Sequence, residues 1–395
     1  MRVTTLARAV AGRAALLLAS LGASFAFAEA AFRTFDVLPT HRDSLRGFYQ
    51  HHPTLGWLGR PGYTARFRHD DFDVVIENDE RGFRRSAEPF DGPADAPRWA
   101  FLGDSFTWGW GVAQGEVFSD RLQRLAGRRA RISNYGVVAY GTGQERLLLE
   151  ELVLPERPDV VVLMFFRNDP TDSVSPKKGR RPYYSLEDGG LRLHNQPVSR
   201  PLVGPLDRLS QHSVVLSILR QQLKRFEDRF EVDHQADPSA QDWGVVSALL
   251  AEMKRVAAGA APPAELRAVY IPAACEIAVG GATRPDACAG PLPPDRESFA
   301  GICAELGIPL LDLTGPLAAA WRASPEPGGH GEPVYFAHDG HWTALGHELV
   351  AQQLFAAWGL AAERPSPQRW EARAASEPAG SETSVPSRPS VTPPP

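Results

Sequence analysis

The sequence predicts an α/β protein built on a mostly parallel sheet. Short apolar runs alternate with segments of helical periodicity from about residue 97 onward, a pattern typical of successive βαβ units. Glycines and small polar residues follow several of these runs, where strands would reach the edge of the sheet. With 395 residues, of which 43% are hydrophobic, the chain can bury a core in one large domain or two smaller ones.

The first 28 residues have the parts of a secretory signal peptide. Arg2, Arg8 and Arg13 form a positive start, an apolar stretch follows, and Ala26-Phe27-Ala28 ends it with small residues. The apolar stretch continues to Phe32 with Glu29 as an interruption, so an uncleaved N-terminal anchor is the alternative. Either interpretation predicts an exported body, periplasmic or extracellular, attached to the inner membrane in the second case.

Residues 29–96 form a lead-in segment that is polar and rich in His, Arg and Pro, with one alternating run at 72–76. We expect it to be short, β-rich and packed on the main domain. The main domain is expected at 97–362, with strands at 99–102, 131–133, 160–166, 266–271 and 309–313. Helices are expected at 117–125, 142–154, 214–230, 245–258, 298–306 and 344–354.

Three local features complete this organisation. Thr142 and Glu145 have the spacing of a capping box at the start of the second helix. Residues 170–263 form a long insertion that we interpret as a lid or substrate wall. Residues 363–395 are rich in Ser and Pro and poor in large apolar side chains, which predicts a disordered tail.

Composition narrows the possible partners. The formal net charge is −5, which gives no basic face for nucleic acid. The three cysteines, Cys275, Cys288 and Cys303, form no Cys-x-x-Cys pair and no zinc-ribbon spacing. In an exported protein Cys275 and Cys288 can form a disulfide and leave Cys303 free, and three unpaired thiols are the alternative.

The sequence Phe101-Leu102-Gly103-Asp104-Ser105 places a serine at the carboxyl end of a predicted strand. Ligands bind at that edge of an open α/β sheet, which makes Ser105 the candidate nucleophile. Alone, Gly-Asp-Ser also describes an ordinary turn. A serine hydroxyl needs a base to take its proton and a third group to orient that base, so the prediction depends on such partners being present.

The best partners lie in a polar loop after the last predicted strand. His341 is the candidate base, and Asp339, two residues before it, is the candidate group that orients its ring. An oxyanion also needs hydrogen-bond donors placed in advance. The backbone amides of Ser105 and Gly136 and the side-chain amide of Asn168 follow successive predicted strands and are the candidate donors.

These residues, in this order, resemble the four motif blocks of the SGNH (GDSL-type) hydrolases, esterases and acylhydrolases. The likeness extends to the bacterial exported branch through His52-Pro53-Thr54-Leu55-Gly56-Trp57 and Asn78-Asp79-Glu80-Arg81-Gly82-Phe83-Arg84, and covers roughly residues 53–360. The resemblance implies a three-layer α/β/α sandwich with a flavodoxin-like sheet, acyl-ester chemistry, and no metal or cofactor. It assigns Ser105 as nucleophile, Gly136 and Asn168 as oxyanion donors, His341 as base and Asp339 as its partner.

Two positions depart from the family pattern. Phe166 stands where the third block usually has glycine, which would narrow the oxyanion side of the pocket. His338 stands three residues before His341, where many members have the acid, so Asp339 takes that role from a closer position.

Other interpretations stay open at this stage. The histidines His330, His338, His341 and His347 suggest a metal site, but their spacing fits no metal-binding helix motif. The same catalytic set would serve an O-acyltransferase acting on a polysaccharide, and a catalytically silent carbohydrate-binding protein would keep the cleft alone. Trp108, Trp110 and Trp342 fit a pocket wall or the core equally well. A glycan, a lipid or a small ester all remain possible substrates.

Overall fold

The computed structural model describes residues 2–35, 47–176, 179–200, 209–210, 212–220, 222, 238–277, 295–323 and 333–359. Its centre is a five-stranded parallel sheet in the order β11-β10-β7-β5-β6. Counted along the chain, this is the 2-1-3-4-5 order of flavodoxin-like sheets. The strands are β5 (Arg98–Gly103), β6 (Arg131–Gly136), β7 (Val160–Phe165), β10 (Glu265–Tyr270) and β11 (Leu310–Asp312). All five predicted strands and the predicted fold class are thus confirmed.

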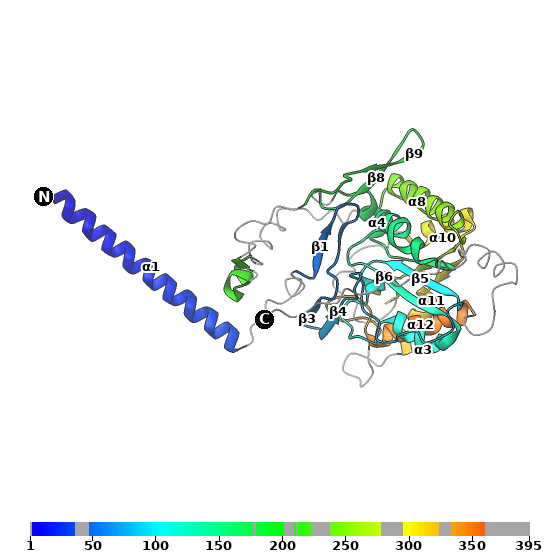
Figure 1. Cartoon of the computed structure of the whole chain (residues 1–395), viewed down its shortest axis with the longest axis horizontal. Helices are drawn as coiled ribbons and strands as arrows, with labels where there is room; N and C mark the ends of the chain where they lie inside the picture. The colour runs from blue at the N-terminus through cyan, green and yellow to red at the C-terminus, as the bar shows by residue number, and fades with distance from the viewer. Residues whose placement is uncertain are drawn as a thin grey trace, which may run out of the picture.

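Helices cover both faces of this sheet and make the three layers of the sandwich. Successive residues of β5 point to opposite faces, so Leu102 enters one hydrophobic cluster and Phe101 the other. Figure 1 shows α4, α8 and α10 on one side and α3, α11 and α12 on the other. Their bounds are α3 (Phe118–Ala126), α4 (Thr142–Leu148), α8 (Ala240–Ala258), α10 (Asp295–Leu306), α11 (Thr314–Ala323) and α12 (Ala344–Ala357).

The point at which the strand order of the sheet reverses determines where the site lies. Because β6 and β7 flank β5, the chain leaves β5 at the point where the strand order reverses, which is where such sheets bind ligands. The register pairs Gly103, the last residue of β5, with Gly136 of β6 and Met164 of β7. The ends of these three strands therefore lie at one edge, as the sequence predicts.

The lead-in segment forms two antiparallel hairpins, β1–β2 (Tyr49–His52 with Gly56–Gly59) and β3–β4 (Thr64–Arg68 with Asp73–Glu77). A separate hydrophobic cluster joins the second hairpin to the main domain and comprises Phe48, Phe67, Phe72, Ile76, Trp108 and Trp110. Trp108 and Trp110 of this cluster follow Ser105 by three and five residues. The lead-in segment therefore packs on the main domain close to Ser105.

The insertion departs from its predicted extent. It contains α5 (Asp169–Val174), the antiparallel hairpin β8–β9 (Tyr183–Glu187 with Gly190–His194) and a short helix at 214–220. Its last helix, α8, buries Leu249, Leu250 and Met253 in the core as the crossover helix between β7 and β10. The part added to the sandwich therefore ends before α8.

The predicted capping box is wrong. Gly141 is the N-cap of α4, and the hydroxyl of Thr142 donates instead to Asp169 Oδ2 at 3.3 Å. Glu145 is fully buried and does not bond back to the N-cap. The helix also changes character after Leu148, continuing as a π-helical turn (Leu149–Val153) and a 3₁₀ turn (Leu154–Glu156).

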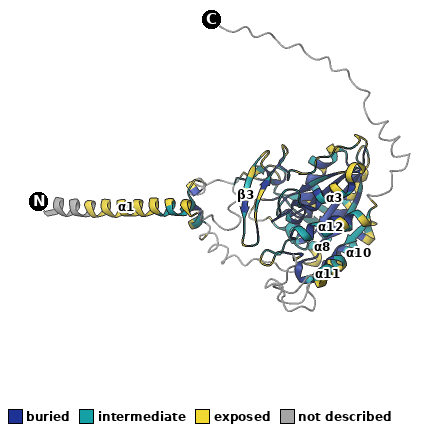
Figure 2. Cartoon of the chain, turned by 90° about the horizontal axis from the view of Figure 1, so that it is seen from below, coloured by how far each residue is buried: buried dark blue, intermediate teal, exposed yellow. Residues whose placement is uncertain are grey.

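The N-terminal helix α1 (Arg2–Thr34) projects away from the domain (Figures 1 and 2). Its part from Gly12 to Thr34 is 23 residues long, apolar and unburied, and is long enough to cross a membrane. The predicted tail at 363–395 and most of the predicted helix 214–230 lie outside the described residues. Cys275 and Cys303 are buried thiols, but Cys288 lies outside the described residues, so the disulfide stays a prediction.

Candidate active site

Ser105 is the first residue of a single-turn helix, α2 (Ser105–Trp108), that starts directly after β5. The carboxylate of Asp104 accepts a hydrogen bond from the Phe106 amide at 2.9 Å and caps this helix. Gly103 allows the sharp change of direction, because a Cβ there would lie 2.1 Å from the Thr107 hydroxyl. Asp104 is thus the turn-stabilising residue expected from the sequence, and Ser105 is presented at the edge of the sheet.

The structure brings Ser105, His341 and Asp339 together. Ser105 Oγ lies 2.7 Å from His341 Nε2, and His341 Nδ1 bonds to Asp339 Oδ1. An ionised carboxylate can only accept, so the proton on this side of the ring is on Nδ1. Nε2 is then left with its lone pair toward the serine, ready to accept the hydroxyl proton.

Trp110 supports the acid from the other side. Its indole N–H donates to Asp339 Oδ2 at 3.0 Å, so both carboxylate oxygens are held. Burial alone would raise the pKa of Asp339, but the bond from the His341 ring, the charge of that ring and the Trp110 indole outweigh it and lower this pKa. Trp110 is thus a buried core residue whose indole N–H also holds the acid.

A second carboxylate, Asp71, holds the loop that carries the acid. It lies in the turn between β3 and β4, and its Oδ2 accepts the backbone amides of His338 and Asp339 at 3.0 and 2.9 Å. Its Oδ1 lies 2.8 Å from Nδ1 of His338 and, by this hydrogen bond first, raises the pKa of that exposed ring. The side chain of Asp71 is only 8% exposed. The lead-in segment thus reaches into the active site through Asp71.

The predicted oxyanion donors differ in their surroundings. The amide of Ser105 has no hydrogen-bond partner among the described residues. Asn168 uses one side-chain N–H for Asp172 Oδ2 at 2.8 Å and keeps its second N–H for another acceptor. The amide of Gly136 donates to Asn134 Oδ1 at 2.8 Å, and a Cβ at Gly136 would lie 2.3 Å from the Trp108 nitrogen. Gly136 therefore serves the close packing of β6 against α2, and its amide is already occupied.

Arg181, from the insertion, ties two parts of this edge together. Its Nη1 pairs with Asp172 Oδ1 at 2.7 Å, on the carboxylate that holds Asn168. Its Nη2 donates to the carbonyl of Ala139 at 2.9 Å, in the loop after β6. Ala139 has a φ of 63°, an unusual conformation for a residue with a Cβ. The side chain of Arg181 is fully buried, so this bridge is protected from water.

Three buried carboxyl groups lie behind the nucleophile. Burial, opposed by the Phe106 amide and His341, raises the pKa of Asp104 to about 6. Burial and neighbouring carboxylates also raise the pKa values of Glu145 and Asp169 well above their usual range. Both carboxyl oxygens of Glu145 lack a hydrogen-bond partner.

Aromatic rings surround the base. Phe106 packs against His341 with ring centroids 4.6 Å apart and against Phe166 at 4.5 Å. Phe166 thus occupies the side where the family pattern has glycine. Trp342 is fully buried and Trp108 nearly so, which makes both of them core residues.

The remaining histidines that the structure describes lie apart from one another and have other partners. His347 is buried, accepts the Phe118 amide through Nδ1 at 3.2 Å, and has a pKa held well below its ordinary value by burial. His330 lies outside the described residues. Within the described ranges, no group of three or more His, Cys, Asp or Glu side chains is placed to hold a metal ion.

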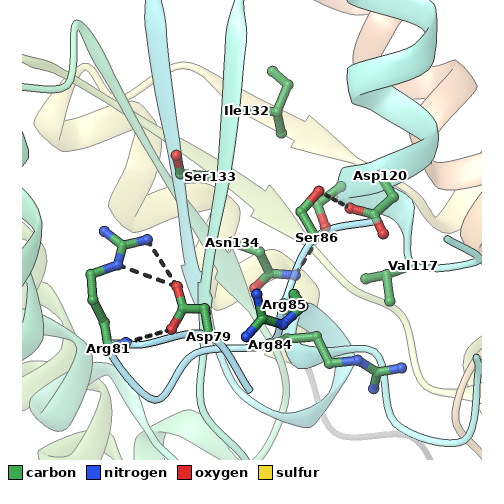
Figure 3. A pocket seen from close by; sticks show the side chains of 11 residues that line it. Asp79, Arg81, Arg84, Arg85, Ser86, Val117, Asp120, Ile132, Ser133 and Asn134 are labelled. Atoms are coloured by element: carbon green, nitrogen blue, oxygen red, sulfur yellow. Dashed lines mark hydrogen bonds and ion pairs between the residues drawn. The ribbon is translucent and has the colours of Figure 1, made fainter. Parts of the chain in front are cut away.

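A small cavity of about 100 Å³ lies between the lead-in segment, α3 and β6 (Figure 3). No member of the catalytic set lines it. Its charged groups are already engaged, since Arg81 bonds to Asp79 and Asp120 accepts the Ser86 hydroxyl. Arg84 donates to the carbonyls of Gly109 and Val112 just after the nucleophile helix. This cavity lies beside the site, and these lining side chains are engaged in hydrogen bonds with one another and with nearby carbonyls.

Comparison with known proteins agrees with this geometry. The sequence model of the GDSL-like lipase/acylhydrolase family matches residues 101–349, more than half of the chain and all of the catalytic set. The chain belongs to this family. The predicted resemblance is therefore confirmed, and membership supports hydrolysis of ester bonds. No match is found among curated proteins.

Solved structures similar to this GDSL family member are distant. A lipolytic protein of the G-D-S-L family from Veillonella parvula DSM 2008 is 14% identical, with a TM-score of 0.38 over 67% of this chain and 99% of its own. An α/β hydrolase, LAE5, from the metagenome of Lake Arreo is 14% identical, with a TM-score of 0.39 over 68% and 98%. The acetyl xylan esterase AlAXEase is 15% identical, with a TM-score of 0.36 over 66% and 99%. These likenesses carry no argument about the substrate.

Sequence reasoning missed the residues that support the catalytic set. Asp71 and Arg181 sit in a hairpin turn and in the insertion, where no spacing links them to a motif. The supporting role of Trp110 could have been predicted, because Trp110 follows the Gly-Asp-Ser block by a few residues. An indole N–H beside a serine nucleophile is a candidate hydrogen-bond donor. Asp172 lies four residues after Asn168, a helical spacing that also brings two side chains together.

Proposed function

We propose that the chain is an exported serine esterase that cleaves an acyl ester, with Ser105 as nucleophile, His341 as base and Asp339 as the group that orients the base. The observation that carries the proposal is the 2.7 Å contact between Ser105 Oγ and His341 Nε2, with Asp339 on the far side of the ring. A protein that only bound a glycan would have no need for this alignment.

The chemistry follows from the arrangement of these atoms. Ser105 Oγ attacks the ester carbonyl carbon as its proton passes to His341 Nε2, and the imidazolium is stabilised by Asp339. The carbonyl oxygen becomes an oxyanion, for which the Ser105 amide and the second N–H of Asn168 are the proposed donors. His341 then protonates the leaving alcohol, and the acyl group stays on Ser105.

Deacylation repeats the same steps with water. His341 takes a proton from water, the hydroxide attacks the acyl carbon, and the proton returns to Ser105 Oγ as the acid leaves.

The role of Gly136 depends on its backbone amide. We propose that Gly136 contributes to the oxyanion site only if this amide exchanges Asn134 Oδ1 for the substrate oxygen. Replacing Asn134 by Ala frees the Gly136 amide. This variant therefore distinguishes an amide that binds the substrate oxygen from one that serves only to hold Asn134.

The test is hydrolysis of p-nitrophenyl esters of increasing acyl length by the protein and by Ser105→Ala. We expect turnover with the protein and its loss by several orders of magnitude in the variant, with binding of a serine-reactive phosphonate lost as well. Preference for acetate would indicate a deacetylase and preference for long chains a lipase. Equal turnover in Ser105→Ala would refute the serine mechanism.

For localisation, we propose that α1 keeps the protein at the membrane, with the hydrolase domain outside the cytoplasm. The supports are the apolar 23-residue span at Gly12–Thr34 and the arginines that precede it in the sequence. Cell fractionation tests this: the full-length chain should be found in the membrane fraction, and a shorter soluble chain would indicate cleavage of the first 28 residues.

A further inference from the structure

We propose that the described residues 209–210 and 212–220 belong to a membrane-surface segment, which lies on the outer leaflet against the end of α1 and inserts Leu209 and Leu219 into the lipid. This inference rests on the proposed anchoring by α1 and goes beyond it, because it assigns a second lipid contact to a part of the chain far from the N-terminus.

Hydrogen bonds fix this segment to the end of α1. The carboxylate of Glu29 accepts the Ser213 hydroxyl at 2.8 Å and the amides of Val214 and Val215 at 3.1 Å each. These amides belong to the first turn of the short helix at 214–220, whose N–H groups have no partner within the helix. Arg33 adds a bond to the carbonyl of His212 at 2.8 Å. Figure 1 shows this short helix, in green, next to the C-terminal end of α1.

The depth of the contact fits a membrane interface. Glu29 lies five residues before Thr34, the end of the apolar span, so it sits about 7–8 Å along the helix axis from that end. Amphipathic segments that lie on a bilayer bury their apolar side about 5–10 Å into the headgroup region. The carboxylate of Glu29 at this level has its charge satisfied by the amides, the hydroxyl and Arg33 rather than by lipid.

The distribution of exposed apolar side chains singles out the same place. Leu209 and Leu219 are 58% and 52% exposed. In the described part of the chain, the other large apolar side chains this exposed belong to α1 and Phe35, with Val75 of β4 as the exception. The exposed apolar surface outside α1 is therefore concentrated beside the end of the proposed membrane span.

The composition of the segment also suits lipid. Residues 209–222 contain no Asp or Glu and five large apolar side chains in the stretch from Val214 to Leu219. A segment without acidic side chains is not repelled by anionic headgroups. A second protein could cover the same apolar side chains. The test must therefore distinguish contact with lipid from contact with a protein partner.

The test uses the full-length chain with Cys288→Ser, reconstituted in vesicles of phosphatidylethanolamine and phosphatidylglycerol and labelled with NBD at Leu219→Cys. Val75→Cys is the matched control, being a similarly exposed apolar residue on the lead-in hairpin, and Leu21→Cys reports on α1. We expect the emission at 219 and at 21 to shift to the blue and to lose about half its intensity with doxyl-labelled lipid, and that at 75 to stay unquenched. In Glu29→Ala, quenching at 219 should fall toward the control while that at 21 persists.

Three results would overturn parts of this scheme separately. Quenching at 21 without quenching at 219 would leave the anchor standing and refute the surface segment. A blue shift at 219 that doxyl lipid does not quench would indicate a protein contact instead and refute it as well. Absence of quenching at both positions would refute the anchor itself.

Discussion

Removing Asp71 should lower the rate of catalysis more than it weakens substrate binding. This carboxylate accepts the amides of His338 and Asp339, and Asp339 is the proposed partner of the base. In Asp71→Ala both amides lose the nearly buried carboxylate that accepts them. The carboxylate of Asp339 then no longer has a fixed backbone, and His341 loses the partner that holds its ring.

The size of the effect can be worked from these contacts. A hydrogen bond to a charged group contributes about 1.5–3 kcal/mol. If the alignment of His341 in the transition state loses the equivalent of one such bond, kcat falls about 10- to 100-fold, since about 1.4 kcal/mol is tenfold in rate. KM should change much less, because Asp71 does not touch the substrate side of Ser105.

Two variants serve as controls in the p-nitrophenyl ester assay. Asp71→Asn keeps an oxygen that can accept both amides while its N–H faces the His338 ring, so we expect kcat within a few-fold of the parent. His338→Ala removes the exposed ring and leaves the amides bonded, so it should be nearly neutral. An Asp71→Ala protein with a lowered melting temperature but unchanged kcat would refute the positioning role, and a change in KM alone would do the same.

Further expectations concern the support of the acid, the buried carboxyl groups and the insertion. In Trp110→Phe the indole bond to Asp339 is lost while the packing is kept, so kcat should fall about tenfold. Activity should also begin to decline at a higher pH on the acid side, because the bond that helps lower the Asp339 pKa is gone; an unshifted pH profile would contradict this. Glu145 has a raised pKa in the fold, so its contribution to stability is complete at low pH and is lost as the pH rises through that pKa. Glu145→Gln should therefore raise the melting temperature at pH 9 by a few degrees, roughly 1 kcal/mol, and change it little at pH 5; equal destabilisation at both values would count against the buried charge. Arg181→Lys cannot bridge Asp172 and Ala139 at once, so kcat should fall about tenfold, whereas Arg192→Lys, an exposed ion pair in the same insertion, should be neutral.

Much of the fold was predictable because buried parallel strands are read from short apolar runs. All six residues of β7 are buried, and the run of valines, leucine, methionine and phenylalanine shows this directly. That Ser105, His341 and Asp339 come together was predictable for a related reason. Ser105 follows one strand and the His341 loop precedes the last helix, so a parallel sheet with this strand order has to bring them to one edge.

The errors have local physical causes. The hydroxyl of Thr142 donates to Asp169 and not to a backbone group of its own helix. Asp169 is a tertiary partner, which the spacing of residues in the sequence does not reveal. The amide of Gly136 donates to the side chain of Asn134, two residues away, and the glycine packs closely on α2, so its role as an oxyanion donor stays a prediction. Asp71 lies 267 positions before His338, and only the packing of the β3–β4 hairpin on Trp108 and Trp110 brings them together.

That hairpin changes what counts as the smallest working enzyme. The family match begins at residue 101, inside β5, and leaves the whole lead-in segment out. A protein trimmed to the matched region would still contain Ser105, His341 and Asp339. It would nevertheless lose the hairpin side chains that pack on Trp108 and Trp110 and the Asp71 carboxylate that holds the loop of Asp339. In this protein the region that the family model matches is therefore shorter than the region that holds the candidate active site in place.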